Sequence, residues 1–226
     1  MSYGLQFLNS GNSVVLDSEY ARLCVIESGR YIPNATNGYG SITSFSRVVT
    51  SQNPPLVFVR PDTVAGIAQL GGMKILGSPG NWTGFYIGAY SQVGFKPNGR
   101  YFVSTFGAQP VASYGMRLWD GSSNLLFDSG TASATFTRAF QNWTFFTYEL
   151  GPQGETRSYY VVDFNFTPDE YLLINNFGMN MCSGGPVPRS IYNWWDFSAG
   201  KLYAVTVAFA NPIAFYLPAV FAKISV

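Results

Sequence analysis

The sequence predicts an all-β protein, an antiparallel β-sandwich with little helix. Helical patterning is scarce, because 24 glycines and 13 prolines are spread over the 226 residues and no long segment keeps apolar residues at helical spacing. Short segments rich in β-branched and aromatic residues are plentiful, and turn-forming clusters separate them. A sixteen-residue segment also occurs twice, and each copy has the pattern of a β-hairpin.

The duplicated segment reads YGLQFLNSGNSVVLDS at 3–18 and YGMRLWDGSSNLLFDS at 114–129, without a gap. In the first copy, apolar residues alternate along 3–8, Asn9-Ser10-Gly11-Asn12 supplies the turn, and 14–16 return. In the second copy, Asp120-Gly121 supplies the turn between 116–119 and 125–127. Four residues are identical, since Tyr3, Gly4, Asp17 and Ser18 recur as Tyr114, Gly115, Asp128 and Ser129. The repeat predicts two related halves, or one hairpin used twice.

The second copy begins near the middle of the chain. We therefore expect an N-terminal β domain at 1–112 and a C-terminal β domain at 113–226. No long polar linker marks the boundary near Gln109-Pro110, so the two should pack closely or form one continuous unit.

The strongest strand candidates have β-branched and aromatic residues between turns; they are 56–59, 101–103, 134–138, 144–148 and 159–166. Three stretches rich in glycine, proline and asparagine are expected to be loops, at 28–44, 77–100 and 175–200.

The uncharged segment 202–222 is long enough to span a bilayer as a helix. However, Asn211-Pro212 marks a turn near its centre, Pro218 would break a second helical part, and apolar residues alternate from Val205 to Phe209. We expect two strands folded about Asn211-Pro212 and no stable membrane span. Such an apolar hairpin could pack against copies of itself around a symmetry axis.

The composition limits the functional classes. The net charge is +1, so the basic field that nucleic-acid binding needs is missing. Charged residues make up only 11% of the chain and aromatic residues 17%, which favours an oligomer or a larger assembly that covers apolar surface. Histidine is absent, which removes the commonest general base and metal ligand. We expect no cofactor and no metal.

Cys24 and Cys182 lie far apart and lack the spacing of a zinc site. Two buried free thiols are expected, and a disulfide between them is the alternative. The chain runs directly into the repeat without the pattern of a signal peptide, so we expect synthesis in a cytoplasm.

The best candidates for recognition lie in the expected loop 175–200; they are Tyr192, Trp194, Trp195 and Asp196. Aromatic faces stack on sugars or fit protein pockets, and a neighbouring carboxylate binds hydroxyls. The alternative is that the tryptophans fill a core or a subunit interface. Adjacent residues of an extended segment face opposite ways, so one tryptophan is expected to pack inward. A second candidate group surrounds glycine-rich turns; it comprises Tyr86, Tyr90, Lys96, Asn98, Arg100 and Tyr101.

Motifs of catalysis are missing, and we expect no enzyme. Ser198-Ala199-Gly200-Lys201 matches the S-x-x-K motif, but Gly200 and the following strand pattern predict a turn instead of the required helix. Paired carboxylates could cleave glycosides, and the candidate acids are Asp163, Asp169, Glu170 and Asp196. Structural acids that bind neighbouring groups are the preferred interpretation.

The pattern Y-G-[LM]-x-[FL]-x-[ND], a turn and a closing D-S resembles a hairpin of small tail-tip and tail-fibre-associated virion proteins of tailed bacteriophages. In those proteins it often opens the chain directly after the initiator Met, as Tyr3-Gly4-Leu5 nearly does here. The resemblance covers two segments of the chain, 3–18 and 114–129, and carries no catalytic residues. It implies a structural component of a tail tip or tail fibre, located in the virion, facing the host and contributing to receptor attachment.

The partners implied are other tail proteins and copies of itself, for example in a trimer, together with a host surface glycan or protein receptor. The sequence is compatible with two alternative functions. One is a carbohydrate-binding module that uses the aromatic segment 175–200, and the other is a polysaccharide depolymerase.

Overall fold

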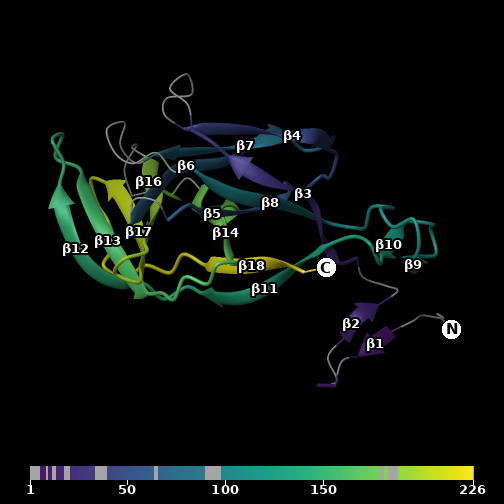
Figure 1. Cartoon of the computed structure of the whole chain (residues 1–226). Helices are drawn as coiled ribbons and strands as arrows, with labels where there is room; N and C mark the ends of the chain where they lie inside the picture. The colour runs from purple at the N-terminus through teal and green to yellow at the C-terminus, as the bar shows by residue number, and fades with distance from the viewer. Residues whose placement is uncertain are drawn as a thin grey trace.

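A computed structural model describes residues 6–8, 10–11, 14–17, 21–33, 40–63, 66–89, 98–178, 181–182 and 188–225. Within these ranges the regular elements are antiparallel β-strands, apart from one turn of 3-10 helix, η2 (Asn175–Gly178) (Figure 1). The predicted all-β class with little helix is confirmed. Each of the five strongest strand candidates lies in or overlaps a strand.

Six strands close into a barrel. Their order is β11 (Ser133–Phe140), β18 (Ala219–Ser225), β14 (Tyr171–Leu173), β5 (Leu56–Pro61), β8 (Gly99–Phe106) and β3 (Leu23–Tyr31). Pairing of Ser133 with Cys24 joins β11 to β3 and closes the ring.

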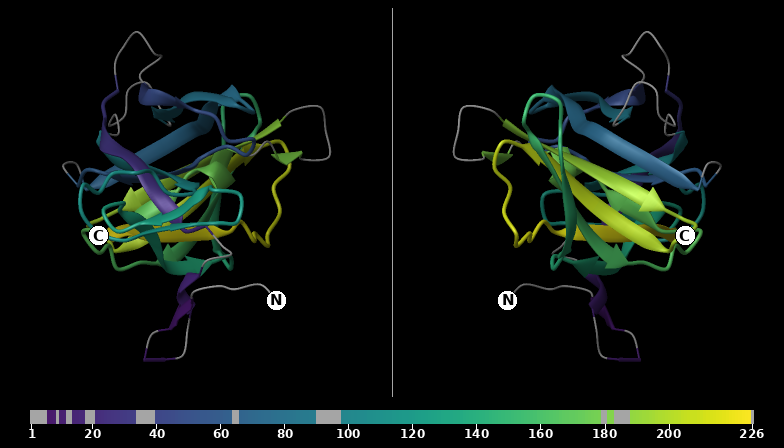
Figure 2. Two further views of the ribbon diagram at one scale, coloured as in Figure 1. Left: turned by 90° about the vertical axis from the view of Figure 1, so that its right-hand side faces the viewer. Right: turned by 90° about the vertical axis from the view of Figure 1, so that its left-hand side faces the viewer.

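The second layer is an eight-stranded sheet. Seven strands follow the order β12 (Thr144–Leu150), β13 (Thr156–Asp163), β17 (Lys201–Ala208), β16 (Pro188–Asp196), β6 (Ile67–Ser78), β7 (Asn81–Ala89) and β4 (Ser41–Val49). The short β15 (Met181–Cys182) pairs with β16. One face of this sheet packs on the barrel (Figure 2). The two layers share a core that includes Phe85, Tyr160, Trp195, Val57, Leu172 and Phe221.

Both layers draw strands from both halves of the chain. In the barrel, β11-β18-β14 from the second half is followed by β5-β8-β3 from the first, and β5 pairs with β14. In the sheet, β6 pairs with β16 across the same divide. Ladder hydrogen bonds therefore join the ranges 1–112 and 113–226 in both layers.

The two copies of the repeat form two hairpins, β1 (Gln6–Leu8) with β2 (Val14–Asp17) and β9 (Arg117–Trp119) with β10 (Leu125–Asp128). Their registers are identical. The pairs Gln6–Asp17, Phe7–Leu16 and Leu8–Val14 recur in the second copy as Arg117–Asp128, Leu118–Phe127 and Trp119–Leu125, with a bulge at the same place. The predicted duplicated hairpin is confirmed.

The strands that follow the two hairpins, β3 and β11, are also equivalent. The pairing of β3 with β8 shifts between Val25 and Glu27, and that of β11 with β18 shifts between Phe136 and Arg138, which are the equivalent positions of the second half. A bulge that recurs at an equivalent position is a specific feature of the fold and not a local irregularity. The sequence repeat therefore marks the start of a longer structural repeat.

Three of the four identical residues hold the second hairpin together. Gly115 has φ of +141°, and a Cβ there would lie 2.0 Å from Ser129 Oγ. Met116 N donates to Ser129 Oγ over 3.1 Å, and the Asp128 carboxylate accepts hydrogen bonds from Arg117, Ala112 and Gly130. Tyr114, the fourth, is 97% exposed. Tyr3, Gly4 and Ser18 of the first copy lie outside the described residues.

The segment 202–222 contributes two strands, as predicted, but they do not form a hairpin. β17 belongs to the sheet and β18 to the barrel. The turn residues anchor the crossing between the layers, because Asn211 Nδ2 donates to Thr156 O and Tyr160 OH donates to Pro212 O. Within the described residues, no helix is long and apolar enough to cross a membrane.

The prediction of a free thiol at Cys24 is confirmed. Cys24 is buried and unbonded, and burial raises its pKa. The side chain of Cys182 lies outside the described part of the chain.

Candidate functional site

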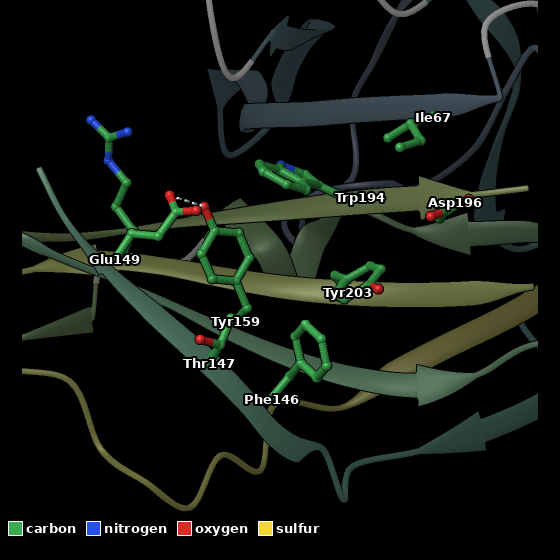
Figure 3. A pocket seen from close by; sticks show the side chains of 9 residues that line it. Ile67, Phe146, Thr147, Glu149, Tyr159, Trp194, Asp196 and Tyr203 are labelled. Carbon is green, nitrogen blue, oxygen red and sulfur yellow. Dashed lines mark hydrogen bonds between the residues drawn. The ribbon is translucent and has the colours of Figure 1, made fainter. Parts of the chain in front are cut away.

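An open pocket of ≈ 420 Å³ lies on the solvent-facing side of the eight-stranded sheet (Figure 3). Strand alternation builds it, because Tyr160, Leu202 and Trp195 point into the core and their sequence neighbours point outward. The residues that line it come from β12, β13, β16, β17 and β6; they are Phe146, Thr147, Glu149, Arg157, Tyr159, Trp194, Asp196, Tyr203 and Ile67.

Four aromatic rings from four strands dominate the pocket. The rings of Tyr159 and Trp194 meet edge to face with centroids 5.3 Å apart, and those of Phe146 and Tyr203 do so at 6.3 Å. Edge-to-face pairs of this kind are favourable and fix the ring planes. The pocket therefore presents a fixed aromatic surface to solvent.

A β-bulge places Phe146 in the pocket. The pairing of β12 with β13 shifts between Phe145 and Thr147, so Phe146 has no direct partner on β13. Phe145 packs inward against Tyr160, whereas Phe146 and Thr147 both lie on the pocket side (Figure 3). Phe146 is 63% exposed, which makes it the outer wall of the pocket.

Polar groups stand at both ends of the aromatic surface. Glu149 Oε2 accepts a hydrogen bond of 2.9 Å from Tyr159 OH, which orients that ring (Figure 3). Asp196 Oδ1 accepts hydrogen bonds from Ser198 Oγ (2.8 Å) and Ala199 N (2.9 Å) in the turn that follows β16. Each carboxylate keeps further acceptor capacity for a bound hydroxyl.

The only cationic residue lining the pocket within the described residues is Arg157, and Glu155 balances its charge. Arg157 Nη2 lies 3.3 Å from Glu155 Oε1. Hydrogen bonds from backbone amides lower the pKa of Glu155, so this carboxylate is charged at neutral pH. With Glu149 and Asp196 added, the acidic groups exceed the basic ones at the site.

The central strand of the site is held on both sides. Residues 192–196 of β16 pair with 201–205 of β17 and with 67–71 of β6. Trp194 therefore stands on a backbone fixed by two ladders. Such a platform needs little reorganisation on binding.

The structure brings together two of the four predicted recognition residues, Trp194 and Asp196, which both line the pocket. Tyr192 lies on the same face, with its ring packed over Gly71, where a Cβ would come within 2.3 Å of it. The segment is not the expected loop: residues 188–196 form strand β16, because the alternation in Ile191-Tyr-Asn-Trp-Trp suits a strand that is buried on one side.

Trp195 is fully buried and is excluded from a surface role. It packs against the rings of Phe166 and Phe197, and the Arg60 guanidinium lies 5.8 Å from its ring centroid. The expectation that one of the two tryptophans packs inward is confirmed.

The second candidate group does not converge on a site. Tyr101 is buried and donates a hydrogen bond of 2.6 Å to Glu27 Oε1, while Arg100 Nη2 donates to Pro168 O. Tyr86 packs beside glycines of β6 and β7, beneath the Lys74 ammonium. Asn98 directly precedes β8, and Tyr90 and Lys96 lie outside the described residues.

Three of the four candidate acids, Asp163, Glu170 and Asp196, bind neighbouring groups. Asp163 accepts a hydrogen bond of 2.9 Å from Lys201 Nζ, which raises the pKa of Lys201. Glu170 is buried and forms an ion pair with Arg138. Ser198 and Lys201 flank a turn in which Gly200 has φ of +62°, so the S-x-x-K match is not helical. No group of three or more metal-ligating side chains occurs in the described part.

Sequence reasoning missed Phe146, Glu149, Tyr159 and Tyr203. Strand alternation places one aromatic side chain of 156–163, that of Tyr159, and one of 201–208, that of Tyr203, on the face away from the core, which is a usable signal. Which strands are neighbours depends on long-range pairing that the alternation does not encode.

Searches against models of protein families, curated proteins and solved structures find no match to this chain. The geometry of the pocket and the hairpin repeat are therefore the basis for assigning a function.

Proposed function

We propose that this protein is a host-facing component of a bacteriophage tail tip or tail fibre and binds a cell-surface saccharide in the aromatic pocket. One observation supports the proposed saccharide binding. Four aromatic side chains from four strands are held on the open face of a rigid sheet, with carboxylates at both ends of the surface that they form.

The chemistry of these groups suits a sugar. Aromatic faces pack against the apolar C–H faces of pyranose rings, and carboxylate oxygens accept hydrogen bonds from ring hydroxyls. A volume of ≈ 420 Å³ falls in the range of about 300–1,000 Å³ that is usual for small-ligand sites.

The charge at the site narrows the ligand class. Glu149 and Asp196 are acidic, and Glu155 balances Arg157. Like charges repel at close range, so we expect neutral or amino sugars to bind better than sialylated or phosphorylated ones.

The virion assignment has separate support. The motif that resembles hairpins of phage tail proteins folds as a hairpin in both copies, with one register and one bulge position. A folded hairpin in each copy is what the resemblance leads us to expect, and this supports the proposal. A low charge and exposed aromatic side chains agree with a chain that works within an assembly.

A glycan array probed with the full chain tests the binding role. We expect binding to one group of neutral or amino sugars, and Trp194→Ala should weaken it at least about tenfold, or 1.4 kcal/mol. Phe106→Ala, which removes an exposed aromatic residue of the barrel, is the matched control and should bind as the wild type does. A folded Trp194→Ala variant that binds as well as the wild type would refute the proposal, as would a blank array.

A further inference from the structure

The two outer edges of the eight-stranded sheet differ in how they are protected. β4 forms one edge and β12 the other. An exposed edge strand offers unpaired N–H and C=O groups to any extended chain, and proteins usually block such edges with charges, bulges or covering segments.

The β4 edge is blocked. Its pairing with β7 is interrupted between Ser44 and Val49. Within this interruption, Glu27 of β3 accepts hydrogen bonds from Ser46 N (2.7 Å) and Ser46 Oγ (2.6 Å). Arg47 adds a charge at the next position. A further strand would have to displace these groups.

The β12 edge is less protected, because its bulge lies near the start of the strand and the residues from Thr147 to Leu150 keep a regular register with β13. Among the described strands β12 pairs with β13 alone. Its sequence, TFFTYEL, has one charged residue and no lysine, arginine or proline. Phe146, Tyr148 and Leu150 are 63%, 59% and 73% exposed. A long apolar edge of this kind is a site of association.

Two of these exposed side chains lie on the inner side of this edge. Tyr148 and Leu150 lie opposite Ser158 and Thr156 of β13, away from the pocket. The crossing segment after β17 is tied to β13 by the hydrogen bonds of Asn211 and Pro212. It exposes three more large apolar side chains, those of Phe209, Ile213 and Tyr216.

We propose that β12 pairs antiparallel with β12 of a second copy of this chain, about a two-fold axis at Tyr148. Only another extended strand can pair with the free backbone N–H and C=O groups along an edge strand. When two identical edge strands pair about a two-fold axis, each covers the other and the assembly is closed. An axis at Tyr148 places Thr147 opposite the partner's Glu149, on the same face of the sheet. The two Glu149 side chains, the only charges on β12, are therefore not directly opposite each other.

This pairing also affects the pocket. The effect on binding that we infer rests on the proposed saccharide binding. Phe146, Thr147 and Glu149 belong both to β12 and to the pocket lining. The second copy's β12 would therefore border the open side of the pocket. Two pockets would lie on one continuous sheet face, and a multivalent cell surface would be bound with avidity.

The mass of the full chain in solution, measured by sedimentation or light scattering, tests the pairing. We expect a dimer of the 24.8 kDa chain or a larger even-numbered assembly, and Tyr148→Lys should halve its mass. Ile42→Lys, on the blocked β4 edge, is the matched control and should leave the assembly intact. Leu150→Glu is a second β12 variant in case Tyr148→Lys does not fold.

Cross-linking locates the axis. Under mild oxidation Tyr148→Cys should form a covalent dimer, and Ile42→Cys should not. A monomer at ~100 μM, where even weak specific contacts form, would overturn the proposal. So would a trimer, or an assembly that neither β12 variant disrupts. Failure of saccharide binding would leave these results unchanged, so the two proposals fail separately.

Discussion

Arg22 Nη2 donates a hydrogen bond of 2.8 Å to Ser133 Oγ, and these residues are 111 positions apart, the offset of the sequence repeat. They are equivalent residues of the two halves and meet where β3 and β11 close the barrel. Ser133 Oγ also donates to Ser225 O of β18 over 3.5 Å. One buried hydroxyl therefore connects both halves at the seam.

Removal of this hydroxyl should weaken the seam. We expect Ser133→Ala to lower the free energy of unfolding by about 0.5–1.5 kcal/mol, because a partly buried hydrogen bond is lost. Denaturant titration measures the change. Ser122→Ala, at an exposed turn position, should have no effect. Equal stability of the two variants would contradict the role of the seam.

Gly115 should not tolerate a side chain. Its φ of +141° and the 2.0 Å approach of a Cβ to Ser129 Oγ predict that Gly115→Ala opens the β9–β10 hairpin. Hydrogen exchange at Met116 N and Ser129 N, both bonded within the hairpin, should accelerate at least about tenfold, which corresponds to a local loss of 1.4 kcal/mol. Gly121→Ala is the control, since no atom lies within 4 Å of a Cβ there. Unchanged exchange in Gly115→Ala would show that the repeated glycine is not structural.

Substitutions of the two adjacent tryptophans should affect stability and binding separately. Trp195→Ala removes a fully buried ring and should cost about 3–5 kcal/mol of unfolding free energy. Trp194→Ala, at the pocket, should cost far less and should weaken saccharide binding at least about tenfold. Thermal unfolding and a binding titration on both variants measure this difference. Equal destabilisation by both substitutions would assign Trp194 to the core.

Acid should destabilise the protein, and Glu170 and Glu27 should be among the carboxylates responsible. Burial alone would raise the pKa of Glu170, but hydrogen bonds from Arg138 and Thr167 outweigh it and hold the pKa below its ordinary value of 4.5. The same balance lowers the pKa of Glu27, through Ser46 and Tyr101. Both groups bind protons more readily when unfolded, so their stabilisation is present above pH 4.5 and is lost as the pH falls through the folded values.

Urea unfolding at a series of pH values checks this linkage. We expect the free energy of unfolding to fall below about pH 4.5, and Glu170→Gln should make that fall shallower. The substitution also leaves Arg138 without its ion-pair partner, so the variant should be less stable at neutral pH. An identical slope in the wild type and the variant would show that Glu170 does not carry the acid sensitivity.

Local patterns in the sequence were sufficient to predict the all-β class, five strand regions and the hairpins. They did not predict β7, which lies inside the stretch 77–100 that was expected to be a loop. Alternation and turn residues located both hairpins, and the identical Gly115 and Ser129 reflect a contact that only glycine permits. Local signals did not reveal that β17 and β18 belong to different layers, because both strands are apolar and the turn at Asn211-Pro212 is compatible with a hairpin or a crossing.

The site was half predictable for the same reason. Adjacent residues on a strand face opposite ways, so the sequence predicted that one of Trp194 and Trp195 is buried, without saying which. The neighbours of Trp194 in the pocket come from β17, which follows after a single turn, and from β12 and β13, which lie much earlier in the chain. Their pairing is set by the packing of the whole sheet.

The most direct test of saccharide binding in the pocket is the NMR spectrum of the five tryptophan indole N–H groups during titration with a sugar selected on the array. Trp194 lines the pocket, Trp195 is buried beneath it, and Trp119 lies on the β9–β10 hairpin. We expect the Trp194 resonance to shift in proportion to occupancy and the Trp119 resonance to stay in place. A shift at Trp119 with none at Trp194 would place the ligand elsewhere and contradict binding in the pocket.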